Sequence, residues 1–192
     1  MGRFLGPFGC AGIILDGLGQ NGGDEVNDLG QQSTAVVVET ASGQLSGEQE
    51  GRVYRFRSVP FAAPPVGPLR FARPQPVTPW TGVKSAVAPA PLPPQTPSRL
   101  SRVLGDYPLD CDEDCLYLNI ATPGIDDTRR PVMVWLCGGA FLTGGNAISW
   151  YDGARFASDH DIVFVGVNYR LGALGFLNLS GVSEGNLGVH DQ

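Results

Sequence analysis

Two adjacent glycines that follow an uncharged run are the residues of this chain best suited to chemistry. Residues 131–136, Pro-Val-Met-Val-Trp-Leu, carry no charge, which predicts a strand buried on both faces of a sheet. Gly138 and Gly139 follow almost at once. Because glycine has no Cβ, the pair can turn the backbone sharply and direct N–H groups into a cavity, as an oxyanion hole requires. A simple turn from strand to loop is the alternative.

A thiol nucleophile at Cys137 is a second possibility for the same segment. A reactive cysteine needs a histidine or another positive group that stabilises its thiolate. The two histidines, His160 and His190, are distant from Cys137 in the sequence, and Cys137 ends an apolar strand. We therefore expect Cys137 to be unreactive.

Composition limits the classes of protein to which the chain can belong. Its 192 residues are 42% hydrophobic and include 27 Gly and 16 Pro, which indicates one loop-rich globular domain. A net charge of -6 argues against nucleic-acid binding. No apolar run approaches the roughly 18 residues of a membrane-spanning helix. The cysteines have neither CxxC spacing nor companion histidines, so we expect no metal site, and nothing points to a cofactor: Cys10, Cys111, Cys115 and Cys137.

The first half of the chain consists of segments that differ in composition and in the pattern of apolar residues. Residues 1–33 are rich in glycine and lack periodicity, so we interpret them as a disordered leader and not as a signal peptide. Alternating apolar residues at 36–40 and 51–56 predict a small antiparallel meander. Prolines then predict an extended surface coil over residues 60–80. Four apolar side chains are expected to anchor that coil: Phe61, Leu69, Phe71 and Trp80. A second proline cluster, at 89–97, opens a poorly defined loop that continues to residue 110.

The second half predicts a βαβ unit. Apolar runs indicate strands at 116–121, 131–136 and 162–169, and residues 151–157 indicate a short helix capped by Asp152. Ligands in such units bind beyond the carboxyl ends of the parallel strands. This places residues 138–141 at the functional edge of the sheet.

Six separated blocks resemble, in the same order, the type-B carboxylesterase and cholinesterase family of the α/β-hydrolase fold. They are residues 59–71 (VPFAAPPVGPLRF), 113–119 (EDCLYLN), 137–141 (CGGAF), 151–153 (YDG), 168–172 (NYRLG) and 185–192 (GNLGVHDQ). The resemblance is closest to bacterial para-nitrobenzyl-esterase-like members, whose loop also ends Gly-Gly-Ala. It implies that residues 34–192 are the N-terminal part of an α/β-hydrolase domain, truncated before its nucleophile elbow. A mixed, mostly parallel central sheet with helical crossovers is then expected after the meander, and the implied activity is hydrolysis of carboxylic esters.

The same resemblance implies roles for the glycine loop. Gly139 and Ala140 are the implied backbone donors to the ester oxyanion, Gly138 allows their close approach, and Phe141 contacts substrate. A third donor comes from the residue after the nucleophile. Cys137 departs from the family, which usually has His or Tyr there. That change removes a side chain that braces the loop but leaves the backbone donors in place.

Two ion pairs and one missing disulfide are also implied. Arg70 with Glu113 ties the proline-rich coil to the EDCLYLN block, and Arg170 with Asp191 braces the strand end near the site. Both roles are structural. The usual disulfide partner of Cys115 would lie near residues 93–95, where this chain has no cysteine. The missing partner favours a cytoplasmic over a secreted protein.

Residues 181–185 satisfy the G-x-S-x-G pattern, which normally marks the nucleophile elbow of an α/β-hydrolase. An elbow needs a strand before the serine and a helix directly after it, and neither is indicated around Ser183. His190 and Asp191 are adjacent, so they cannot hold separate places in a relay. We therefore expect Ser183 to be a loop residue, and the resemblance places the catalytic serine, acid and histidine beyond Gln192.

Three further expectations follow from the resemblance. Choline-binding members of the family carry a tryptophan before the EDCLYLN block, and its ring binds the cationic ammonium group. This chain has no tryptophan between residues 81 and 134, where Gly105 and Tyr107 stand, so we expect neutral esters of modest size rather than choline esters. A sheet without its nucleophile strand should expose an apolar edge along 162–169. The alternative function is a non-catalytic binding or adhesion member, since the fold alone does not fix the activity.

Overall fold

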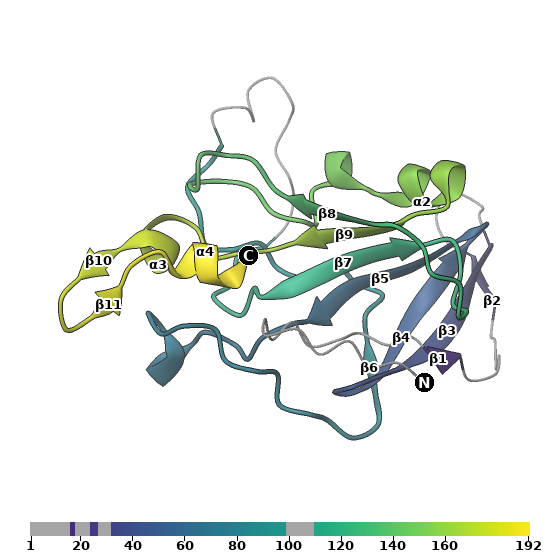
Figure 1. The fold of residues 1–192 in the computed structure, drawn as a ribbon, viewed down its shortest axis with the longest axis horizontal. Helices are drawn as coiled ribbons and strands as arrows, with labels where there is room; N and C mark the ends of the chain where they lie inside the picture. The colour runs from purple at the N-terminus through teal and green to yellow at the C-terminus, as the bar shows by residue number, and fades with distance from the viewer. Residues whose placement is uncertain (1–15, 18–23, 27–31, 99–109) are drawn as a thin grey trace.

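The computed structural model describes residues 16–17, 24–26, 32–98 and 110–192. Most of the described chain lies in or around one mixed sheet with the strand order β1-β3-β4-β5-β7-β9-β8, in which β2 also pairs with β3 and β6 with β4 (Figure 1). Its strands are β1 (Asp16–Gly17), β2 (Asp24–Val26), β3 (Gln32–Thr40), β4 (Gly43–Glu50), β5 (Val53–Pro60), β6 (Val83–Ser85), β7 (Tyr117–Thr122), β8 (Val132–Leu136) and β9 (Val163–Val167). The predicted mixed sheet is confirmed, but the expectation that it is mostly parallel does not hold for the described residues. In the described residues β8–β9 and β4–β6 are parallel, and the other ladders of this sheet are antiparallel.

The predicted meander is confirmed as β3, β4 and β5, which pair antiparallel in sequence order. The sequence did not indicate β4, because its residues are mostly polar and only Leu45 and Gly47 are buried. Pairing with the strands on either side makes this segment a strand. Whether a segment forms a β-strand depends strongly on the neighbouring strands against which it packs, and not only on its own residue types.

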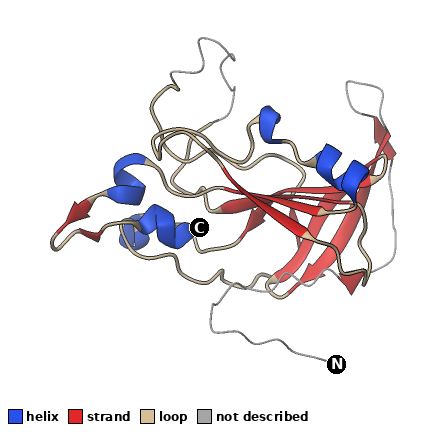
Figure 2. Ribbon diagram, turned by 45° about the horizontal axis from the view of Figure 1, so that its top comes forward, coloured by secondary structure: helices blue, strands red, loops and turns tan. Residues whose placement is uncertain are grey.

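Apolar side chains pack on both faces of the sheet. One core cluster joins the meander to β7 and consists of Val38, Leu45, Phe56, Val59, Ala86 and Ile120. The other face holds Val53, Ala121, Ala157 and Phe164, where α2 (Ala154–His160) packs across β5, β7 and β9. Figure 2 shows α2 lying along the sheet, whereas α3 (Gly172–Phe176) and α4 (Leu187–Asp191) lie beyond one end of it.

The predicted βαβ unit is confirmed, since β8 and β9 are parallel and α2 connects them. The helix begins three residues later than predicted, after a 3₁₀ turn at Ser149–Tyr151. The predicted cap is wrong by one residue, since the N-cap is Gly153, which has no side chain to form a cap bond; Asp152 lies just before it and accepts a hydrogen bond from the Ala154 N–H at 2.9 Å. The same carboxylate binds Arg55 of β5, which links the start of the helix to the meander.

The prediction that residues 131–136 are buried on both faces is wrong. Strand β8 is the edge of the sheet, and all five of its side chains are exposed, by 38% to 61%. Among the described strands it pairs with β9 alone, and the described helices pack over other strands. The expected exposed edge along 162–169 is wrong for the same reason, because β9 has β7 on one side and β8 on the other.

The proline-rich coil over residues 60–80 is confirmed, with a single 3₁₀ turn at Gly67–Leu69. Its anchors are partly buried. Phe61 packs against Ala62, Cys115 and Leu116, and the Trp80 Nε1–H donates to the Gln44 carbonyl oxygen at 2.9 Å.

Several predictions fall outside the described residues. Most of the proposed leader, residues 1–33, is among them, although β1, β2 and the first residues of β3 pair in the sheet. Gly105 and Tyr107, in the loop of residues 99–109, also lie outside. Across the described chain, no helix has the length and apolar character needed to cross a membrane. Over the same residues, no three His, Cys, Asp or Glu side chains group as metal ligands.

Candidate oxyanion-binding site

The glycine loop, residues 137–145, begins where β8 ends. The parallel strands β8 and β9 both point toward the side of the molecule that holds α3 and α4 (Figure 1). The backbone N–H of Gly172, at the start of α3, donates to the Phe141 carbonyl oxygen at 2.8 Å. The loop therefore lies at the carboxyl edge of the parallel pair, where α/β proteins bind ligands.

Three successive residues of the loop have positive φ angles, namely Gly139 (135°), Ala140 (54°) and Phe141 (61°). A Cβ atom on Gly139 would lie 1.8 Å from the Thr143 carbonyl oxygen, so no residue other than glycine fits there. Ala140 and Phe141 adopt left-handed backbone that is costly for residues with a side chain. Such strain persists where surrounding contacts hold the conformation, and it is typical of functional loops.

The glycine loop uses some of its N–H groups in hydrogen bonds and leaves others unpaired. The Gly139 carbonyl oxygen accepts from the N–H groups of Leu142 and Thr143, at 3.0 and 3.2 Å. In the described part of the chain, the N–H groups of residues 138–141 have no hydrogen-bond acceptor. These four residues are exposed. Successive unpaired N–H groups in left-handed backbone can form a concave site for an anion.

Aromatic residues from the segment after β9 and from α3 pack against the glycine loop. The Tyr169 hydroxyl donates to the Cys137 carbonyl oxygen at 2.6 Å, within a buried cluster that also contains Leu171. The Phe141 ring lies 4.8 Å from the Phe176 ring and 6.4 Å from that of Tyr169, between ring centroids. Because Phe141 remains 49% exposed, one side of its ring is available for contact with another group.

The Cys137 side chain is placed for packing, since only 3% of the residue is exposed. Burial raises the pKa of its thiol, which favours the neutral form. A nucleophilic cysteine needs the opposite shift. The geometry therefore supports the expectation that Cys137 is unreactive.

Arg170 and Asp191 lie together in the interior, 3% and 0% exposed in their side chains. Arg170 Nε and Nη2 donate to the two carboxylate oxygens at 2.8 and 2.7 Å, and the Arg170 backbone N–H adds a third bond at 3.0 Å. Nη1 donates to the Ala72 carbonyl oxygen at 2.8 Å. The pair thus joins the end of β9, helix α4 and the proline-rich coil.

Arg70 and Glu113 also form a two-bond pair, at 2.6 and 2.8 Å, but at the surface. Their side chains are 47% and 27% exposed. The hydrogen bonds and the charge of Glu113 raise the pKa of the Arg70 guanidinium, which stays charged in any case. Solvent screens this pair far more than the buried one.

Ser183 lies in the two-residue strand β11 (Ser183–Glu184), which pairs with β10 (Asn178–Leu179) in a hairpin. Its hydroxyl oxygen accepts from the Gly185 N–H at 3.2 Å, and 7% of the residue is exposed. No helix follows directly, because α4 begins only at Leu187. The strand, serine and helix sequence of a nucleophile elbow is therefore absent around Ser183.

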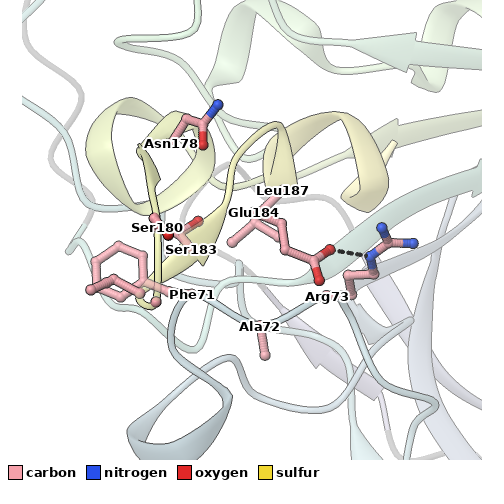
Figure 3. A pocket seen from close by; sticks show the side chains of 10 residues that line it. Phe71, Ala72, Arg73, Asn178, Ser180, Ser183, Glu184 and Leu187 are labelled. Atoms are coloured by element: carbon pink, nitrogen blue, oxygen red, sulfur yellow. Dashed lines mark hydrogen bonds and ion pairs between the residues drawn. The ribbon is translucent and has the colours of Figure 1, made fainter.

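Figure 3 shows the side chains around a cavity of about 680 Å³ beside this hairpin. Phe71, Ala72 and Arg73 of the proline-rich coil line one side of it, and Arg73 Nε binds Glu184 at 2.9 Å. The cavity is lined by neither histidine nor the glycine loop. Ser183 thus has no histidine base in this cavity, and the Glu184 carboxylate there is paired with Arg73.

The sequence analysis missed residues whose side chains bind segments far away in the sequence. Asn168 Oδ1 accepts from the Asn146 N–H at 2.7 Å, and its Nδ2 donates to the Pro91 carbonyl oxygen at 3.0 Å. Gln95 binds Gly144 of the glycine loop. Asn168 falls in the NYRLG block, which could have signalled a role, whereas Gln95 carries no local signal.

The described cysteines Cys111, Cys115 and Cys137 are free thiols. Cys115 is fully buried, and burial, followed by the charge of Asp191, raises the pKa of its thiol to about 12. Cys111 is exposed. Cys115 therefore packs as a neutral apolar side chain.

Comparison with known proteins agrees with this geometry. Residues 34–192 match the family described as the Carboxylesterase family. The chain is 44% identical over 163 residues to phenmedipham hydrolase of Pseudarthrobacter oxydans, covering 83% of this chain and 32% of that protein. It is 40% identical over 162 residues to para-nitrobenzyl esterase of Bacillus subtilis, covering 83% and 33%. A carboxylesterase structure from Geobacillus stearothermophilus aligns with a TM-score of 0.72 and 41% identity, over 81% of this chain and 32% of that one. The chain spans about a third of the length of these relatives.

Proposed function

Because this chain belongs to the carboxylesterase family, we propose that it supplies the oxyanion-binding part of a carboxylic ester hydrolase. One observation carries the proposal: the N–H groups of Gly139 and Ala140 stand unpaired, within the described structure, on a strained loop at the carboxyl edge of β8. Relatives named as esterases and hydrolases give further support.

The proposed role follows from the charge that develops in ester hydrolysis. Attack on the carbonyl carbon moves negative charge onto the carbonyl oxygen, and donors already in place stabilise that charge without reorganising. Gly139 and Ala140 are the proposed donors, and Gly138 leaves room for the oxygen to approach, since a side chain there would narrow the site. Backbone N–H groups do not titrate, so this half of the site is independent of pH.

Phe141 is the proposed contact for the substrate. Its half-exposed ring packs against the rings of the buried Tyr169 and of Phe176 at the edge of the loop. An apolar ring suits the uncharged acyl or alkoxy group of an ester. We propose neutral carboxylic esters of modest size as substrates.

The reaction also needs a nucleophile and a base. His160 and His190 are both exposed, and the Ser183 hydroxyl bonds to Gly185 and not to a histidine. We propose that the nucleophile, acid and base belong to the part of the relatives that this chain does not span. The chain alone is then expected to show no saturable esterase activity, because loss of the serine or histidine of a triad costs roughly a million-fold in kcat.

The test is a fusion, called here the completed enzyme, in which this chain is joined after Gln192 to the remaining C-terminal part of the Bacillus subtilis para-nitrobenzyl esterase. Hydrolysis of p-nitrophenyl acetate is measured for the fusion, for the relative itself and for this chain alone. The proposal predicts saturable hydrolysis by the first two and none by the third. A fusion that unfolds cooperatively but has no activity would contradict it and favour a non-catalytic binding member.

A further inference from the structure

The glycine loop is held from outside by a side chain of the second proline-rich segment. Gln95 Nε2 donates to the Gly144 carbonyl oxygen at 2.7 Å, and the Gly144 N–H donates to Gln95 Oε1 at 2.8 Å. The same Nε2 donates to the Pro93 carbonyl oxygen at 3.0 Å, which fixes the orientation of the amide. One side chain thus satisfies both polar groups of one loop residue, 49 positions away in sequence.

Gly144 in turn lies against the residues that begin the site. It is buried, has a φ of 123°, and a Cβ atom there would lie 2.6 Å from the Gly138 carbonyl oxygen and 3.2 Å from the Cys137 sulfur. Its backbone therefore packs directly against Gly138. A shift of Gly144 must move Gly138, and with it the N–H groups of Gly139 and Ala140.

The next residues of the loop are fixed by the same proline-rich segment. Leu92 fills the space beside Gly145, where a Cβ atom would lie 2.3 Å from its Cδ2. Asn168 links Pro91 to the Asn146 N–H. Residues 91–95 and the residue after β9 therefore hold both ends of the segment 144–146, and Gln95 is the member that binds closest to Gly138.

We infer that Gln95 is a positioning residue for the oxyanion donors, an inference that rests on the proposed function. The amide of Gln or Asn carries an N–H donor and a carbonyl acceptor side by side on one planar group, which suits it to bind the C=O and the N–H of Gly144 at once. Gln95 itself contacts no reacting group. Its role is to keep Gly144, and through it the donors, where the oxyanion develops. A displacement of about 1 Å in such a site can lower the rate about 100-fold.

Two substitutions of Gln95 test whether it positions the oxyanion donors or only stabilises the fold as a whole. Gln95→Ala removes both bonds to Gly144. Gln95→Glu keeps the acceptor for the Gly144 N–H but places a carboxylate oxygen against the Gly144 carbonyl oxygen. Gln75→Ala is the matched control, because the Gln75 side chain is exposed and bonds only to Arg73, two residues away.

In the completed enzyme, we expect both Gln95 variants to lower kcat about 10- to 100-fold with KM nearly unchanged, and to weaken binding of a trifluoromethyl ketone transition-state analogue in proportion. The Gln95→Glu deficit should shrink at acidic pH, where the protonated carboxyl group regains a donor for the Gly144 carbonyl oxygen. Gln75→Ala should match the unmodified enzyme. Amide hydrogen exchange of the glycine loop, measured in the 192-residue chain and in the completed enzyme, should be faster in the Gln95 variants alone.

The outcomes of this experiment are distinct. Unchanged kcat and unchanged loop exchange in both Gln95 variants would overturn the positioning role and leave the proposed function standing. A loss that appears equally in kcat, KM and thermal midpoint would also overturn it, since that result marks general support of the fold. An unmodified completed enzyme without activity would instead contradict the proposed function.

Discussion

The Tyr169 hydroxyl donates a hydrogen bond of 2.6 Å to the Cys137 carbonyl oxygen, and both residues are buried. Tyr169 follows β9 and Cys137 follows β8, so the bond joins the ends of the two parallel strands at the point where the glycine loop begins. The Cys137 thiol is only a weak hydrogen-bonding group, so the strong bond at this point is the one from the Tyr169 hydroxyl to the Cys137 backbone. In this chain the brace comes from the neighbouring strand.

Tyr169→Phe should therefore weaken the start of the glycine loop. The substitution leaves a buried carbonyl oxygen without its donor, which typically lowers the free energy of unfolding by about 1–3 kcal/mol. Urea unfolding of the completed enzyme measures the change. Tyr54→Phe is the control, because the Tyr54 hydroxyl has no hydrogen-bond partner in the described structure. Equal stability of the two variants would mean that the Tyr169 bond does not brace the loop.

The buried pair of Arg170 and Asp191 should dominate the charge contribution to stability. Asp191→Asn leaves an arginine charge unpaired in the interior, and breaking a buried pair in this way lowers the free energy of unfolding by about 3–5 kcal/mol. Glu184→Gln breaks the Arg73 pair, whose side chains are 60% and 70% exposed, and should leave the urea midpoint unchanged. Similar midpoints for the two variants would contradict the structural role of Asp191.

Cys115 should make the fold less stable at alkaline pH. The pKa of its thiol is raised from 9.0 to about 12, so between these values the unfolded state loses a proton that the folded state keeps. Stability therefore falls as pH rises above 9, by about 1.4 kcal/mol between pH 8 and pH 10 for this group. Urea midpoints under reducing conditions at both pH values test this. Cys115→Ala should reduce this loss of stability between pH 8 and pH 10, whereas Cys111→Ala, which changes an exposed thiol, should not. An equal loss in the two variants would exclude Cys115 as the cause.

Strand β8 should control association of the isolated chain. Its five apolar side chains lie on an unpaired sheet edge, an arrangement that favours pairing with other chains. Val134→Lys places a charge at a side chain that is 58% exposed and should reduce the light scattering of the 192-residue chain. Val66→Lys, at a 40% exposed residue of the proline-rich coil, is the control. A monomeric unmodified chain, or equal effects of both changes, would contradict this prediction.

The sequence predicted those parts of the fold that depend on residues close together in the chain. The βαβ unit was predictable because an apolar strand, a glycine loop, a short helical segment and a second apolar strand follow one another in the sequence. The position of the glycine loop followed from that unit, and glycine at position 139 is required by contact with Thr143.

Features set by distant partners were not predictable in this way. Strand β4 is polar and becomes a strand through its neighbours, and β8 is apolar yet lies at the edge, because strand order is not encoded in hydrophobicity. Gln95 stands in a proline-rich segment that suggests only a loop. Its pairing with Gly144 depends on how two segments 49 residues apart come together.

The most direct test of the central claim compares two variants of the completed enzyme in hydrolysis of p-nitrophenyl acetate. Gly139→Pro removes a backbone donor and cannot adopt the φ of 135°, so kcat should fall by about 10²–10³-fold or more. Ser183→Ala should leave kcat unchanged, because Ser183 lies in the β10–β11 hairpin, away from the glycine loop, and the bond described for its hydroxyl is the one accepted from the Gly185 N–H. The account is contradicted if Ser183→Ala is inactive while Gly139→Pro retains full activity, since the catalytic serine would then be Ser183 and the glycine loop would not bind the oxyanion.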